Sequence, residues 1–103
     1  MNKKARALDM FNTNFANPHG LQNVLNFSTA RDIITLSVYC WDFEKCRIIA
    51  NTEIYTALIY ANKELNDCLE IMWKNTNKLL NEGWEGIKTG QTITAGSCLS
   101  SFR

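Results

Sequence analysis

The 103-residue sequence has few of the residues from which metal sites and disulfide frameworks are built. It contains one histidine, one proline and four cysteines, and the cysteines form no Cys-x-x-Cys pair. A zinc site usually needs such closely spaced ligands, so we expect no metal, and no motif indicates a cofactor. We expect reduced, mostly buried thiols at the scattered positions Cys40, Cys46, Cys68 and Cys98.

An excess of charge of one sign is also lacking. Eleven basic and ten acidic side chains leave a net charge of +1, which gives no electrostatic argument for binding nucleic acid or an anionic membrane. No apolar run approaches the length of a bilayer span. The start, MNKKARALDMF, lacks the apolar core of a signal peptide, and the cellular compartment is left undetermined. The length allows one modest domain.

The first half of the sequence predicts helices. One covers residues 1–8, with Ala5 and Leu8 facing inward. Ser28 resembles an N-cap for a second helix that runs to about residue 41, and Asp42 can cap a third over residues 43–50. The second helix has a broad apolar surface, which implies that it is mostly buried; the face consists of Ala30, Ile33, Ile34, Ser37, Val38 and Trp41, widened by Leu36, Tyr39 and Cys40.

The segment FNTNFANPHGLQNVLNF, residues 11–27, predicts a specified loop. Pro18 favours an extended Asn17, and Gly20 permits a tight reversal. The single histidine, His19, invites an acid/base or metal-ligand interpretation. Without a second histidine or a carboxylate at ligand spacing, we interpret His19 as a structural residue that hydrogen-bonds the loop.

The second half predicts strands. TEIYTALIY (residues 52–60) and CLEIMWK (68–74) are rich in β-branched and aromatic residues, which favours a hairpin with ANKELND (61–67) as its turn. A helix is the alternative, because five positions also satisfy a helical period: Ile54, Leu58, Leu65, Leu69 and Met72. NTNKLLNEGWEG then predicts one short helical turn with Leu79 and Leu80 inward.

The stretch GIKTGQTITAG, residues 86–96, predicts a strand bounded by turns, with Ile93 and its flanking threonines in the strand and a turn at Ala95-Gly96. The following SCLSSF (97–102) can pair with it antiparallel through a tight hairpin. Lys88-Thr89-Gly90 suits an anionic, peptide-like ligand, because it offers a charge, a hydroxyl and room for a ligand backbone.

Four ordered motifs resemble those of the serine D-Ala-D-Ala carboxypeptidases, which are low-molecular-mass penicillin-binding proteins sharing a fold with class A β-lactamases. The motifs are NPHGL (17–21), STARD (28–32), WKNTNKLL (73–80) and GIKTG followed by AG.CL (86–99). The resemblance implies an α+β fold in which N-terminal helices precede antiparallel strands carrying Lys-Thr-Gly. It also implies acyl transfer through a serine, with release of the terminal D-alanine of a peptidoglycan stem peptide, outside the cytoplasmic membrane.

The resemblance assigns roles along the strand. Lys88 would help to hold the substrate carboxylate, and Thr89 would donate a hydrogen bond to it. Gly90 would leave room for a substrate lying along the strand edge. The backbone N–H of Gln91 would occupy the place of an oxyanion-hole donor.

The sequence departs from the family in its serines: none is followed by lysine three positions on or by asparagine two positions on. We therefore expect residues 1–103 to be a partial carboxypeptidase domain, inactive alone, that binds a D-Ala-D-Ala peptide or β-lactam when completed. The alternatives are a non-catalytic remnant that binds a peptide or partner along the Lys88 strand, and an unrelated small α+β protein. Uncovered strand edges and helix faces also predict self-association.

Overall fold

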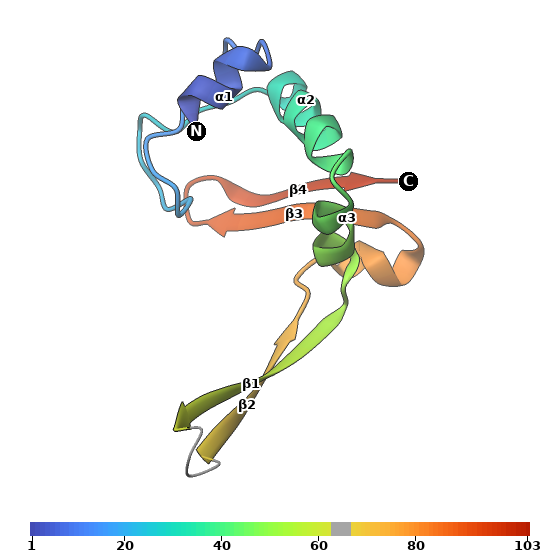
Figure 1. Ribbon diagram of the computed structural model, residues 1–103. Helices are drawn as coiled ribbons and strands as arrows, with labels where there is room; N and C mark the ends of the chain where they lie inside the picture. Colours follow the sequence, from blue (N-terminus) through green and yellow to red (C-terminus); the bar gives the residue numbers. More distant parts are fainter. Residues whose placement is uncertain (63–66) are drawn as a thin grey trace.

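A computed structural model describes residues 1–62 and 67–103 of the chain, and it places helices first and antiparallel hairpins second (Figure 1). The helices are α1 (Asn2–Ala7), α2 (Ala30–Trp41) and α3 (Glu44–Asn51). The strands are β1 (Ile54–Asn62), β2 (Asp67–Lys74), β3 (Glu85–Thr92) and β4 (Gly96–Phe102), with a 3-10 helix, η1 (Lys78–Glu82), before β3. The predicted α+β order is confirmed, and the short helical turn predicted in NTNKLLNEGWEG is η1.

The predicted N-caps of α2 and α3 are both wrong by one residue. Thr29, not Ser28, caps α2, because its extended backbone lets Oγ1 accept a hydrogen bond from the Asp32 N–H at 3.2 Å. Asp42 keeps helical dihedrals (φ −66°, ψ −17°) at the end of α2, so Phe43 is the N-cap of α3 and makes no side-chain cap hydrogen bond.

A small polar cluster joins the loop after α1 to the first turn of α2. The buried carboxylate of Asp32 accepts hydrogen bonds from the Thr13 hydroxyl at 2.6 Å and from the Asn12 N–H at 3.1 Å. Ser28 joins the cluster through its hydroxyl, 2.8 Å from that of Thr13. In the part of the chain that the structure describes, the buried hydrophobic residues are only Ala5 and Met10, so polar contacts carry much of this junction.

The loop between α1 and α2 is closed by its own hydrogen bonds. Asn14 and Phe27 form an isolated antiparallel bridge, and Gly20 adopts a left-handed φ of 75° that permits the reversal. Nδ1 of the exposed His19 accepts a hydrogen bond from the Leu21 N–H at 3.1 Å. The predicted hydrogen bond between His19 and its own loop is thus confirmed.

The prediction that α2 is mostly buried is wrong. Ile34 is 61% exposed and Val38 is 50% exposed, because no described element packs against that side of the helix. The opposite side, with the buried Ser37, faces the β3–β4 hairpin, and the Ser37 and Ser100 hydroxyls lie 2.8 Å apart. The thiol prediction is also partly wrong: all four cysteines are free, but only Cys40 is half-buried and the other three are exposed.

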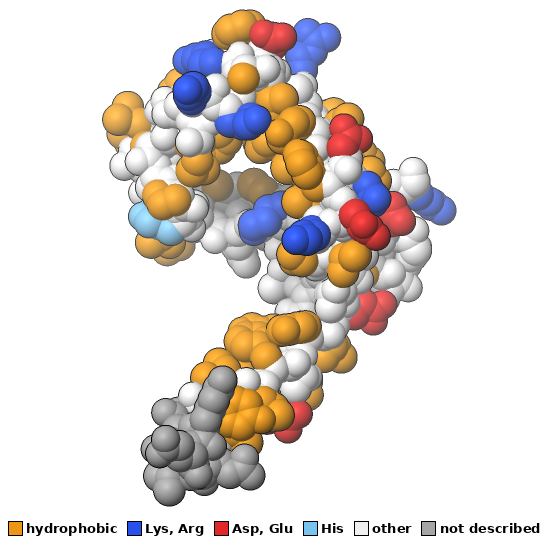
Figure 2. Space-filling model, in the orientation of Figure 1, with side chains coloured by type: hydrophobic (Ala, Val, Ile, Leu, Met, Phe, Trp, Pro, Cys, Tyr) orange, Lys and Arg blue, Asp and Glu red, His pale blue; other side chains and the backbone are white. Residues whose placement is uncertain are grey.

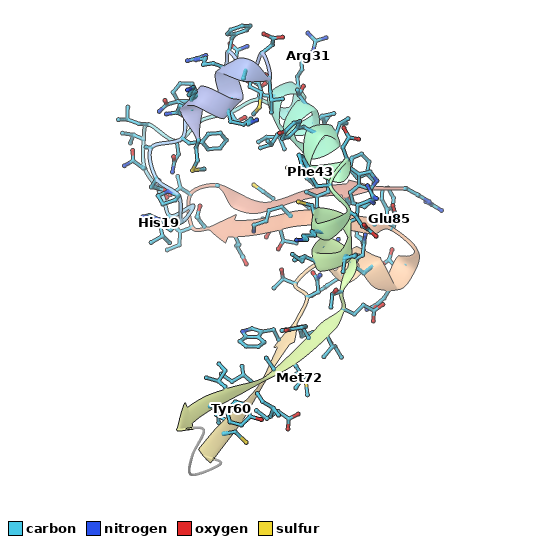
Figure 3. The ribbon with its side chains drawn as sticks, viewed as in Figure 1. His19, Arg31, Phe43, Tyr60, Met72 and Glu85 are labelled. Carbon is cyan, nitrogen blue, oxygen red and sulfur yellow. The ribbon has the colours of Figure 1, made fainter. Side chains whose placement is uncertain are left out.

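The β1–β2 hairpin projects away from the rest of the molecule (Figure 1). Its antiparallel register confirms the hairpin and excludes the helical alternative, while residues 63–66 of the predicted turn lie outside the described residues. Side chains alternate between faces of a strand, so the register gathers one wholly apolar face: Tyr55, Ala57, Ile59, Leu69, Ile71 and Trp73. Tyr60 and Met72, labelled in Figure 3, belong to the opposite, mixed face. Hydrophobic side chains cover much of the hairpin surface (Figure 2).

The start of β3 passes tightly beneath the end of α3. The Gly86 N–H donates a hydrogen bond to Oδ1 of Asn51 at 2.8 Å. A Cβ at Gly86 would lie 2.8 Å from the Ala50 carbonyl oxygen and 2.9 Å from Nδ2 of Asn77, closer than real Cβ atoms approach their neighbours. The glycine is therefore required by this contact, which sets where β3 begins.

The β3–β4 hairpin is antiparallel as predicted, but its turn comes earlier. Ile93, Thr94 and Ala95 form the reversal, so the prediction of Ile93 and Thr94 in the strand is wrong, and Gly96 already belongs to β4. Gly96 supplies the left-handed φ of 68° at the end of the loop.

Candidate substrate-binding site

A β-bulge determines where Lys88 points. Gly86 pairs with Ser101 and Lys88 pairs with Ser100, so Ile87 is the extra residue on β3. A bulge interrupts the alternation of side chains, and both Ile87 and Lys88 line the same groove as a result. The sequence analysis did not predict this bulge, because the residues around Ile87 were interpreted as an ordinary strand.

The groove that Lys88 faces is a cavity of about 550 Å³ between the two longer helices and the β3–β4 hairpin. Figure 2 shows a hollow in this part of the molecule with hydrophobic side chains around it. Among the described residues that line the groove, Lys88 contributes the only charged side chain. Its ammonium group donates a hydrogen bond to the Thr89 carbonyl oxygen, so the cation is held along β3.

Two cysteines border the same groove. Burial raises the pKa of the Cys40 thiol, and a second, smaller contribution comes from the neighbouring Cys46. Cys40 is therefore held in its neutral thiol form over a wider pH range than an exposed cysteine.

A second pocket, of about 470 Å³, lies between η1 and the β3–β4 hairpin. It is lined by the other three residues predicted for the site, which are Thr89, Gly90 and Gln91. A Cβ placed on Gly90 would have no atom within 4 Å, so the space above this glycine is open to a ligand backbone. Ser97 and Cys98 of β4 complete the wall.

A smaller cavity of about 170 Å³ is lined by residues from both halves of the motif. Lys88 and Thr89 both line it, together with the segment Asn75–Asn77. The structure thus brings all four predicted residues onto one strand, but it distributes the ammonium and the hydroxyl over two sides of it. Chemically, a cation and a hydroxyl donor beside an unhindered backbone suit a carboxylate-ended peptide.

Sequence reasoning gave Thr76 no role in the site, although the residue lies in the WKNTNKLL motif. Its Oγ1 makes a short hydrogen bond to Oγ1 of Thr89 across the pocket, from the connection between β2 and η1. No local pattern could have found this pair, because the two residues lie on separate elements and meet only through the packing of η1 against β3.

The described residues were also compared with what a metal site and a membrane-spanning helix require. Among residues 1–62 and 67–103, no cluster of three or more His, Cys, Asp or Glu side chains could hold a metal ion. In the same described ranges, each helix is too short or too polar to cross a bilayer.

The helix-then-hairpin fold and the Lys-Thr-Gly strand define a penicillin-binding, transpeptidase-type domain, and a family model described as D-alanyl-D-alanine carboxypeptidase matches residues 1–102. The chain belongs to this family. It is 34% identical over 103 residues to the D-alanyl-D-alanine carboxypeptidase DacF of Bacillus subtilis, covering 98% of this chain and 25% of that protein. It is 38% identical to a D-alanyl-D-alanine endopeptidase of Pseudomonas aeruginosa, covering 96% of this chain and 31% of that protein.

Solved structures give the same result. The Streptomyces K15 DD-transpeptidase is 32% identical, with a TM-score of 0.87, over 97% of this chain and 38% of that one. The chain therefore spans less than two-fifths of the solved chain and less than a third of each of these curated relatives.

Proposed function

We propose that these 103 residues form the substrate-binding wall of a serine-type D-Ala-D-Ala carboxypeptidase, a hydrolase that removes the terminal D-alanine from a peptidoglycan stem peptide. The observation that carries the proposal is the Lys88-Thr89-Gly90 strand, whose charge, hydroxyl and open glycine border two pockets that share Thr89 in their linings. Lys88 attracts the substrate carboxylate, Thr89 donates a hydrogen bond to it, and Gly90 admits the peptide backbone. The Gln91 N–H serves as an oxyanion-hole donor.

The nucleophile in this proposal comes from outside the 103 residues, because their sequence contains neither Ser-x-x-Lys nor Ser-x-Asn. The apolar groove beside Lys88 offers the place where the serine-bearing part of the domain packs. Residues 1–103 are then a partial domain whose ligands, a D-Ala-D-Ala peptide or a β-lactam, are bound productively once the remainder is supplied.

The test compares the chain alone with a completed domain. The isolated chain is expected to gain no mass on incubation with a penicillin, because an acyl adduct needs the missing serine. Joined to a segment carrying Ser-x-x-Lys and Ser-x-Asn, it is expected to form the adduct and to release D-alanine from a peptide ending in D-Ala-D-Ala. Lys88→Ala in the completed domain should lower kcat/KM by about 100-fold or more, as loss of one electrostatic contact to the reacting substrate does elsewhere.

Lys45→Ala is the matched control for this experiment, since Lys45 is exposed on α3 and lines none of the pockets bordered by Lys88. A stable acyl adduct on the isolated chain would overturn the assignment of the nucleophile. Equal loss of activity in the Lys45 and Lys88 variants would overturn the assigned role of Lys88. Peptide binding by a completed domain that releases no D-alanine would instead favour a non-catalytic remnant.

We also propose that the chain self-associates through the apolar face of the β1–β2 hairpin. Tyr55 is 61% exposed and Leu69 is 63% exposed, on a two-stranded ribbon that no further described strand extends. Such ribbons are marginally stable in isolation and favour contact with other chains. Sedimentation is expected to show association that increases with concentration and weakens in an Ile59→Ser, Leu69→Ser variant.

The control for self-association is Thr56→Ser, which changes the opposite, mixed face of the same hairpin and should sediment like the unchanged chain. A monomer with a cooperative melt at all concentrations would contradict the proposal.

A further inference from the structure

Among the described residues, the hydroxyl of Thr89 has one hydrogen-bond partner, and that partner lies outside Lys-Thr-Gly, in the WKNTNKLL motif. Oγ1 of Thr76 makes a short hydrogen bond to Oγ1 of Thr89, and either hydroxyl can be the donor. The two threonines line the pocket of about 470 Å³ together, and they also line the cavity of about 170 Å³ that Lys88 borders. The contact therefore lies where the hydroxyl side and the ammonium side of the motif meet.

The backbone on both sides of Thr76 is held by asparagine side chains. Nδ2 of Asn75 donates hydrogen bonds to the carbonyl oxygens of Ala50 and Thr52, each at 3.0 Å, which ties this turn to the end of α3. Oδ1 of Asn75 accepts a hydrogen bond from the Asn77 N–H at 2.9 Å.

The buried Asn77 continues the anchoring into η1, where its Oδ1 accepts a hydrogen bond from the Leu79 N–H at 3.1 Å. Thr76 itself is exposed, but it stands between two residues whose side chains are fixed. Its hydroxyl is thus presented to Thr89 from a rigid support, which is the arrangement that keeps a ligand-binding group in one orientation.

The direction of the hydrogen bond decides what Thr89 can do. A hydroxyl has a single proton to donate but can accept twice. If Thr89 donates to a carboxylate, its proton is committed, and the contact with Thr76 persists only when Thr76 is the donor. A hydroxyl that accepts a hydrogen bond becomes a better donor, since such chains polarise one another.

We propose that Thr76 is a positioning residue for carboxylate recognition: it donates to Oγ1 of Thr89 and thereby directs the Thr89 proton to the ligand. This inference rests on the proposed function, which makes Thr89 a donor to the carboxylate of a D-Ala-D-Ala peptide. It adds a residue of the β2–η1 connection to a site that Lys-Thr-Gly alone confines to β3.

The test is an NMR titration of the full chain with N-acetyl-D-Ala-D-Ala and with its C-terminal amide, which lacks the carboxylate. Thr76→Val removes the hydroxyl with little change of shape, and it is expected to weaken binding of the acid by about three- to ten-fold, the value of one net hydrogen bond. Binding of the amide should weaken less, because its carbonyl oxygen is a weaker acceptor than a carboxylate. Thr76→Ser restores a hydroxyl and should restore the preference for the acid.

A double-mutant cycle separates this role from a structural one. Thr76→Val combined with Thr89→Val is expected to bind the acid no more weakly than Thr89→Val alone, because Thr76 acts through Thr89. Equal weakening of acid and amide, or additive losses, would overturn the inference. If Thr89→Val loses acid binding but Thr76→Val binds the acid as the unchanged chain does, the inference about Thr76 is overturned and the proposed function stands. If Thr89→Val binds the acid unchanged, both the inference and the proposed function are overturned.

Discussion

Replacing Gly86 by alanine is expected to lower the free energy of unfolding by about 1–3 kcal/mol, the usual cost of overpacking a well-filled site. The added methyl would meet two groups that have no freedom to withdraw: the Ala50 carbonyl oxygen in the last turn of α3 and the amide of the buried Asn77. Either α3 or β3 must move, and such movement would also strain the hydrogen bond from the Gly86 N–H to Asn51.

Gly90→Ala is the matched control, on the same strand and with no atom within 4 Å of the added Cβ. Its unfolding free energy should stay within about 0.5 kcal/mol of the unchanged chain. Urea unfolding measures both variants, at one fixed chain concentration because association would shift the apparent stability. Equal stability of the two alanine variants would show that β3 does not pass tightly beneath α3.

Asp32→Ala is expected to lower the free energy of unfolding by about 1.5–3 kcal/mol, because hydrogen bonds to a charged group are lost inside the fold. The carboxylate is 5% exposed and accepts from both the Thr13 hydroxyl and the Asn12 N–H. The Thr13 hydroxyl keeps Ser28 as a partner after the substitution, whereas the Asn12 N–H loses its acceptor. Asp32→Asn retains an acceptor oxygen, so it should lose less stability than Asp32→Ala.

Asp42→Ala provides the comparison for Asp32, since Asp42 is exposed at the other end of the same helix. We expect its urea midpoint to change by an amount equivalent to less than about 0.5 kcal/mol. The junction between the first loop and α2 would have to be held by other contacts if the Asp32 and Asp42 variants unfolded at the same urea concentration.

Local patterns were sufficient to predict the elements and the placement of Lys88-Thr89-Gly90 on a hairpin strand. The enrichment of β-branched and aromatic residues separated the β1–β2 hairpin from a helix. The stretch between Gly86 and Gly96 located the motif strand, although that strand already ends at Thr92. The family assignment also followed from residues alone, because four motifs occur in order.

Features that depend on contacts between distant elements could not be predicted. The choice of Thr29 over Ser28 as N-cap is tied to the hydroxyl contact between Ser28 and Thr13. The exposure of Val38 is a second example. An apolar helix face predicts that the face packs against something, but it does not tell whether one of the described elements packs there. The Thr76–Thr89 contact likewise exists only after η1 packs beside β3.

The bulge at Ile87 decides how apolar the surroundings of the Lys88 ammonium are. Lys88 pairs with Ser100 and lies on the same face of the hairpin, and the extra residue Ile87 joins it in the groove. Loss of Ile87 would leave Lys88 opposite Ser100 but would take one apolar side chain away from the groove.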